Sequence, residues 1–173
     1  ISPDSNWIAA VEYDSIDAPK NQGTVVSLDG KTKFQLRHGG EVTGVGFSSD
    51  SQLVLTSGVN GIISLWDVRT GEKTDDLAIG GKIHSLATSP TGTLIAVGLH
   101  DKIAIWDVAT REKVDELSQP GDISSLAFSR EGQWLASGSS ESTAILWKVE
   151  GNKFSAEGDP FQLNNEPNIL AFS

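Results

Sequence analysis

The sequence predicts an all-β protein made of short antiparallel strands in a repeat of roughly 40 residues. Trp66, Trp106 and Trp147 recur at intervals of 40 and 41 residues, each near the end of an apolar run. Apolar residues alternate in the runs that open each period, which is the period of a strand. Clusters rich in Gly, Ser, Asp and Pro separate the runs, as turn residues do. Four short strands in each period are typical of a propeller blade.

Each period is expected to hold its four strands in a fixed order. The first run alternates, the second and third are almost continuously apolar, and the fourth is polar. In chain order the runs are residues 42–48, 53–58, 63–68 and 73–77, then 83–89, 94–98, 103–108 and 113–117, then 123–129, 134–138 and 144–149. Continuous apolar runs predict central strands that are covered on both faces. The charged fourth run predicts an outer edge that does not recruit another chain.

The tryptophans stand in a recurring dipeptide. It is Trp66-Asp67 and Trp106-Asp107 in two copies, Trp147-Lys148 in a third and Leu28-Asp29 in the first. On these in-phase copies the chain resembles the WD40-repeat family. The resemblance implies β-propeller blades of four antiparallel strands and a non-catalytic scaffold that binds a partner protein or peptide on the propeller rim.

Four repeats are expected over residues 1–173, because a serine closes the first run of each repeat at Ser2, Ser48, Ser89, Ser129 and Ser173. Blade 1 takes residues 2–40 and an inner strand from residues 168–173. Blades 2, 3 and 4 take residues 41–80, 81–121 and 122–165. A closed ring of four blades would need about 90° between neighbouring blades, which is far more than the roughly 51° of a seven-blade ring and would break the dense packing between blades. Two alternatives stay open: a homodimer that completes an eight-blade ring, and a half-ring that is a fragment of a longer propeller.

The resemblance also implies a buried hydrogen-bond relay that links a histidine, a hydroxyl, an acidic or amide side chain and the tryptophan of a blade. The matching residues are His38, Ser57, Asn60 and Trp66 in the second repeat, and Gln119, Ser137, Glu141 and Trp147 in the fourth. The third repeat has Ile79 and Val97 at the first two positions and a shortened turn with His100-Asp101 before Trp106. An unpaired buried polar group costs about 1–3 kcal/mol. We therefore interpret the relay as structural rather than catalytic.

The residues that flank the first apolar position of each inner strand are implied to face the partner-binding rim. They are Glu41, Thr43, Lys82, His84, Asp122, Ser124, Asn168 and Leu170. The net charge of −10 favours a basic peptide or protein as the partner. The polar segment of residues 14–23 is interpreted as a surface loop, with partner binding as the alternative.

Composition excludes several other functions. The absence of Cys removes thiol nucleophiles, disulfides and thiolate metal cages. The acidic balance disfavours nucleic acids and anionic membranes, and no apolar stretch reaches the roughly 20 residues of a membrane span. We find no three-ligand metal spacing, no cofactor motif and no nucleophile beside a base, so no catalytic residue is expected.

An enzyme of the propeller fold, a hydrolase or isomerase with its site in the central channel, is the alternative function. It would need a cluster of ionisable side chains pointing into the channel from several blades. Among the rim residues only His84 titrates near neutrality. No signal peptide is visible at the start of the chain, and the absence of Met there is interpreted as a trimmed end, which leaves the compartment open. The expected location is the cytoplasm.

Overall fold

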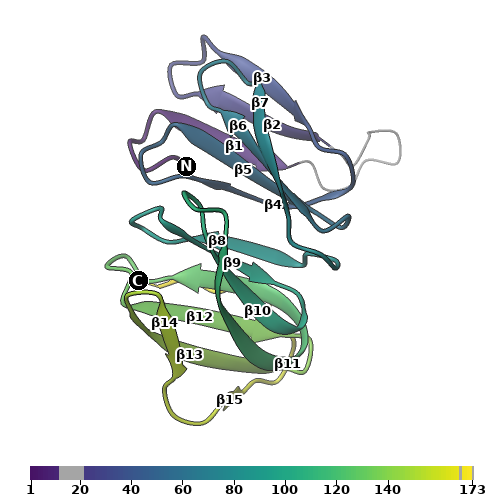
Figure 1. The fold of residues 1–173 in the computed structure, drawn as a ribbon, viewed down its shortest axis with the longest axis vertical. Coiled ribbons are helices and arrows are strands. Elements are labelled where there is room, and N and C mark those ends of the chain that lie inside the picture. The colour runs from purple at the N-terminus through teal and green to yellow at the C-terminus, as the bar shows by residue number, and fades with distance from the viewer. Residues whose placement is uncertain (12–21, 168, 173) are drawn as a thin grey trace. The chain divides into compact units, whose positions relative to one another are not determined.

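The computed structural model describes residues 1–11, 22–167 and 169–172, and the regular elements among them are β-strands (Figure 1). Nothing in this described part is a helix long and apolar enough to cross a bilayer. The chain divides into unit 1, residues 1–83, and unit 2, residues 84–173. Most of the polar segment expected at residues 14–23 lies outside the described residues.

Unit 1 contains two antiparallel sheets in which strands adjacent in sequence are paired. The first has the order β1-β2-β3 and the second the order β4-β5-β6-β7. The strands are β1 (Trp7–Val11), β2 (Gln22–Ser27), β3 (Lys33–Arg37), β4 (Val42–Phe47), β5 (Leu53–Gly58), β6 (Ile62–Asp67) and β7 (Lys73–Ala78). The four-stranded sheet is the expected second blade, with its central strands β5 and β6 largely buried.

Unit 2 repeats this meander, but one long strand joins two of its blades. The strands are β8 (Ser85–Thr88), β9 (Leu94–Gly98), β10 (His100–Asp107), β11 (Lys113–Phe128), β12 (Trp134–Ser139), β13 (Thr143–Glu150), β14 (Lys153–Ala156) and β15 (Phe161–Gln162). The first half of β11 pairs with β10 and its second half, from Ile123 to Phe128, pairs with β12. β11 therefore serves as the outer strand of the third blade and the inner strand of the fourth.

The same tight turn follows the inner-strand phase four times. The serine backbone N–H donates to the carbonyl oxygen five residues later, from Ser2 to Trp7, Ser48 to Leu53, Ser89 to Leu94 and Ser129 to Trp134. The fourth turn residue has a positive φ in every copy, and it is Ser5, Ser51, Gly92 and Gly132. The serines from which the repeat phase was assigned therefore occupy the same turn at these four positions.

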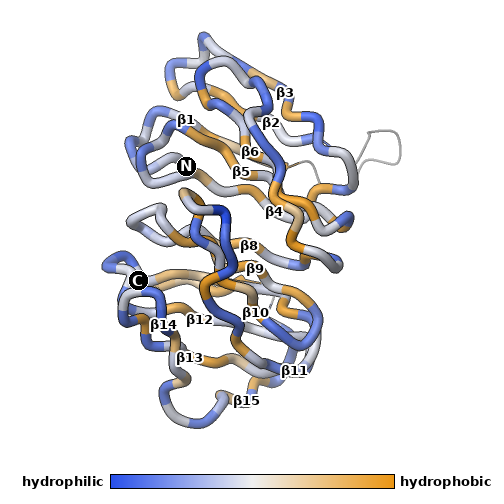
Figure 2. The backbone as a smooth tube through the Cα atoms, viewed as in Figure 1, coloured by the Kyte–Doolittle hydropathy of each residue, from blue (hydrophilic) through white to orange (hydrophobic). Residues whose placement is uncertain are grey.

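Apolar strand residues form a separate core in each unit. In unit 1 Val25, Leu36, Phe47, Val54, Trp66 and Val68 are buried together, with Trp7 packed against them. The unit 2 cluster includes Ile103, Ile105, Ile123, Leu135 and Trp147. In Figure 2 the apolar residues concentrate in the strands and the polar ones in the turns. Alternation and burial thus agree with the predicted all-β fold.

The C-terminal segment contacts blade 4. The Leu170 backbone N–H donates to Ser125 Oγ at 2.8 Å, and Ser124 Oγ donates to the Pro167 carbonyl oxygen at 3.0 Å. Residues 169–172 are in no strand, and Asn168 and Ser173 lie outside the described residues. The expected completion of blade 1 by residues 168–173 therefore stays a prediction.

Candidate functional site

The relay of the second blade centres on a buried threonine. Thr56 Oγ1 accepts a hydrogen bond from Trp66 Nε1 at 2.8 Å and lies 3.0 Å from His38 Nδ1. His38 Nε2 lies 3.1 Å from Asn60 Oδ1. Burial lowers the pKa of His38, which keeps the ring neutral. The hydroxyl was expected from Ser57, but Ser57 Oγ instead bonds Thr43 Oγ1 at 3.2 Å.

The relay of the fourth blade replaces the histidine by a glutamine. Trp147 Nε1 donates to Ser137 Oγ at 2.7 Å, and Ser137 Oγ donates in turn to Gln119 Oε1. Gln119 Nε2 donates to Thr143 Oγ1 at 3.4 Å. Glu141, expected as the acidic member, is exposed, and Thr143 takes that place.

The third blade has lost this relay. Val97 occupies the hydroxyl position, directly opposite Ala104 on β10, and it is fully buried. Trp106 Nε1 is buried without a hydrogen-bond partner among the described residues. One unpaired indole N–H is therefore tolerated in unit 2. Loss of the relay in this blade, and its varied composition in the other two, support a structural role.

The predicted rim residues of unit 1 lie at the beginning of the inner strand β4. Glu41 is exposed and directly precedes β4, and its carbonyl oxygen accepts a hydrogen bond from the Val59 N–H at 2.9 Å. Thr43 is half-buried by its bond to Ser57, while Lys82 is exposed. Glu41 and Lys82 thus have accessible charged side chains.

In unit 2 the structure brings two predicted rim residues together. His84 Nε2 lies 3.5 Å from Asp122 Oδ1, and the same oxygen lies 2.7 Å from His100 Nδ1. The hydrogen bond to Asp122 and the negative charge of Asp101 raise the pKa of the exposed His100. The Asp122 carbonyl accepts the Ser140 N–H at 2.9 Å, as the Glu41 carbonyl accepts that of Val59. Glu41 and Asp122 therefore hold equivalent backbone positions.

Sequence reasoning did not assign His100 to the rim, because it placed His100 in the turn between the second and third strands, whereas the structure has it at the start of β10, paired with Asp122. The signal that could have found it is the antiparallel pairing expected between neighbouring strands, which sets His100 opposite the predicted rim residue Asp122. Ser124 was predicted, yet its hydroxyl is engaged by the Pro167 carbonyl oxygen. Asn168 lies outside the described residues.

The cluster around Asp122 has histidines, a carboxylate and a serine, so its chemistry needs to be tested against catalysis. Nucleophilic catalysis requires a hydroxyl within hydrogen-bond reach of a base. Ser140 Oγ instead accepts the Asp122 backbone N–H at 2.9 Å. Within residues 1–11, 22–167 and 169–172, no group of three or more His, Asp or Glu side chains is suited to hold a metal ion.

The repeated meander, the shared serine turn and the buried Trp66 and Trp147 define blades of the β-propeller class. Two segments, residues 30–67 and 111–148, match the family model described as WD domain, G-beta repeat. Each segment begins shortly before the outer strand of one blade and ends one residue after the tryptophan of the next blade. The chain therefore contains WD40 repeats at two places, and the resemblance inferred from the sequence is confirmed there.

A comparison with curated proteins agrees with this assignment. The chain is 42% identical over 53 residues to the small ribosomal subunit protein RACK1z of Oryza sativa subsp. japonica. The aligned part covers 31% of this chain and 16% of that protein. The fold, all-β with antiparallel four-stranded sheets, is consistent with part of a WD40 β-propeller.

Proposed function

We propose that the chain is a non-catalytic protein-interaction module whose partner docks where the inner strands begin. The observation that carries the proposal is the repeated acidic position, Glu41 before β4 and Asp122 in β11, with the same backbone hydrogen bond at both. The WD40 repeats support a role as a scaffold for proteins. The proposed partner-binding residues are Glu41 and Lys82 in unit 1 and, in unit 2, His84 and Asp122, with His100 added from the structure.

A basic peptide or protein segment is the proposed partner chemistry. The chain carries a net charge of −10, and the side chain of Asp122 is 42% exposed although two imidazoles approach one of its oxygens. Charges at the rim of an interface mainly accelerate association and make it sensitive to salt. A homodimer that completes a ring, and a cytoplasmic location, stay predictions; the solution mass of the chain tests the dimer.

The test uses an array of synthetic peptides whose net charge is graded from basic to acidic, probed with the labelled 173-residue chain. The variants Glu41→Gln and Asp122→Asn each remove one rim charge, and Glu72→Gln and Glu131→Gln remove one exposed charge at turns at the other strand ends. We expect a preference for basic peptides that the rim variants reduce and the controls retain. Equal binding by all four variants would contradict the rim assignment.

A further inference from the structure

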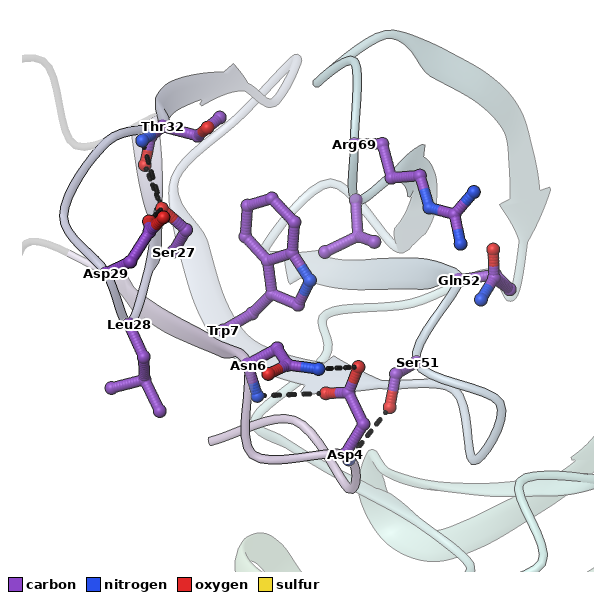
Figure 3. A pocket seen from close by; sticks show the side chains of 11 residues that line it. Asp4, Asn6, Trp7, Ser27, Leu28, Asp29, Thr32, Ser51, Gln52 and Arg69 are labelled. Carbon is purple, nitrogen blue, oxygen red and sulfur yellow. Dashed lines mark hydrogen bonds between the residues drawn. The ribbon is translucent and has the colours of Figure 1, made fainter.

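Unit 1 has a pocket of about 430 Å³ at the strand ends opposite to the predicted rim (Figure 3). Glu41 precedes the beginning of β4, whereas Ser51 and Gln52, which line the pocket, follow its end. The half-buried indole of Trp7 lies between Asp29 on one side and Arg69 on the other. The volume lies within the range of about 300–1,000 Å³ that is usual for ligand sites.

Two exposed carboxylates give this pocket negative charge. Hydrogen bonds from Ser2 and Asn6 lower the pKa of Asp4 to about 2. Hydrogen bonds from Ser27 and the Lys31 backbone lower the pKa of Asp29. Both groups are therefore ionised at neutral pH.

Positive charge beside the pocket only partly offsets these carboxylates. Lys31 Nζ lies 3.5 Å from Asp29 Oδ2 with a largely exposed ammonium group. Arg69 lines the far side of the pocket, next to Gln52. The negative charge is thus gathered at Asp4 and Asp29, away from Arg69.

The serine turn of blade 3 shows that the fold does not require this combination of an aromatic ring and a carboxylate, although the turn of blade 4 has Glu131 and Trp134 at these positions. A smaller pocket of about 250 Å³ lies beside the equivalent serine turn, where Thr91 and Leu94 take the places of Asp4 and Trp7. The turn itself is the same, because Ser2 and Ser89 make the same backbone hydrogen bond. Trp7 and Asp4 therefore add chemistry that the repeat can do without.

We propose that the unit 1 pocket binds a cationic side chain, lysine or arginine, of a basic peptide segment. The cation lies over the Trp7 ring, since an indole face attracts cations more strongly than other aromatic side chains do. Its charge faces Asp4 and Asp29, and its aliphatic stem covers Leu28, which is 53% exposed. Arg69 and Gln52 donate hydrogen bonds to carbonyl oxygens of the peptide backbone. This site is separate from the rim because it lies at the other end of β4.

The test follows the Trp7 indole signal in ¹H–¹⁵N correlation spectra of the full 173-residue chain. The probe is an acetylated, amidated peptide with one arginine between Gly and Ser residues, titrated into the millimolar range. The control peptide has neutral citrulline in place of arginine. We expect saturable shifts of the Trp7 indole and the Asp29 amide with the arginine peptide, and little or no shift of Thr91 and Leu94 in unit 2.

Two variants keep the proposal falsifiable. Trp7→Leu installs the residue of the equivalent position in blade 3, Leu94, and Asp29→Asn changes an exposed side chain that is not part of the core. Each should weaken binding of the arginine peptide about 3- to 30-fold. Far-UV circular dichroism checks that the variants fold; should Trp7→Leu unfold, Asp29→Asn alone decides through the Trp7 signal.

Equal shifts with the citrulline peptide would overturn the proposal, as would unchanged affinity in Asp29→Asn. Equal shifts at Leu94 would also overturn it, since they would indicate binding at any blade junction. The rim variant Asp122→Asn should leave the Trp7 titration unchanged. A wrong rim assignment and a wrong pocket assignment are therefore distinguishable, because each is tested by its own variants, Asp122→Asn for the rim and Asp29→Asn for the pocket.

Discussion

The relay of the second blade predicts a large loss of stability when its central hydroxyl is removed. Thr56→Val keeps the shape of the side chain but leaves Trp66 Nε1 and His38 Nδ1 without the oxygen they share at 2.8 and 3.0 Å. Thr56 is 0% exposed, His38 2% and Trp66 5%, so water does not replace the lost partner. Two buried groups at about 1–3 kcal/mol each give an expected loss of about 2–6 kcal/mol in the free energy of unfolding.

Urea denaturation followed by tryptophan fluorescence measures this loss as a lower transition midpoint. Thr24→Val is the matched control, because Thr24 lies in β2 of the same unit and no hydrogen bond of its side chain is found among the described residues. The reverse change, Val97→Thr, offers an acceptor to the unpaired Trp106 Nε1 and should raise stability by up to about 1 kcal/mol. Equal midpoints for Thr56→Val and Thr24→Val would refute the reasoning.

Three further predictions concern pH and the backbone. Burial lowers the pKa of His38 below its ordinary 6.5, so the stability that its neutral ring contributes is complete above about pH 6.5 and is lost as the pH falls through the lowered pKa. His38→Gln, which installs the residue type of blade 4, should flatten this part of the profile of stability against pH. An unchanged profile would contradict the assignment. Ser5 has a φ of 57° where two equivalent turns have Gly, so Ser5→Gly should stabilise by about 0.5–1 kcal/mol in thermal unfolding, and a lower melting temperature would count against it. A Cβ at Gly98 would lie 2.6 Å from the Ile123 carbonyl oxygen and against Ser85 Oγ, so Gly98→Ala should cost about 1–3 kcal/mol; a urea midpoint equal to that of the wild type would show that the strands can separate.

The repeat phase could be predicted from sequence because it depends on local patterns. Alternation, apolar runs and turn residues recur every roughly 40 residues, and the structure has strands at each of these runs. The same serine turn is found at four of the five positions chosen for it. The boundaries were less predictable, since residues 113–128 form one continuous strand where two were expected.

The prediction of Ser57 as the relay hydroxyl of the second blade was wrong, because Thr56 Oγ1 makes the relay contacts. The pairing of the second strand with the third identifies the relay position. Thr56 lies opposite Ser64, two residues before Trp66, and Ser137 lies opposite Ile145, two residues before Trp147. Ser57 is one position further along the strand, and a shift by one residue turns a side chain to the other face of the sheet. The prediction of Glu141 as a relay member was wrong, because its side chain is exposed and Gln119 contacts Thr143 instead. The direction of a turn side chain depends on contacts that the sequence pattern does not show.

The sequence by itself determined the all-β class, the repeat length and the acidic character, because each is a property of composition or of spacing along the chain. The tertiary structure decided which side chains meet: Asp122 with His84 and His100, and Trp7 with Asp29 and Arg69 around one pocket. These groups are up to about sixty residues apart in the chain. Strand register and the packing of neighbouring sheets bring them together, and neither can be deduced from the local pattern of any single repeat.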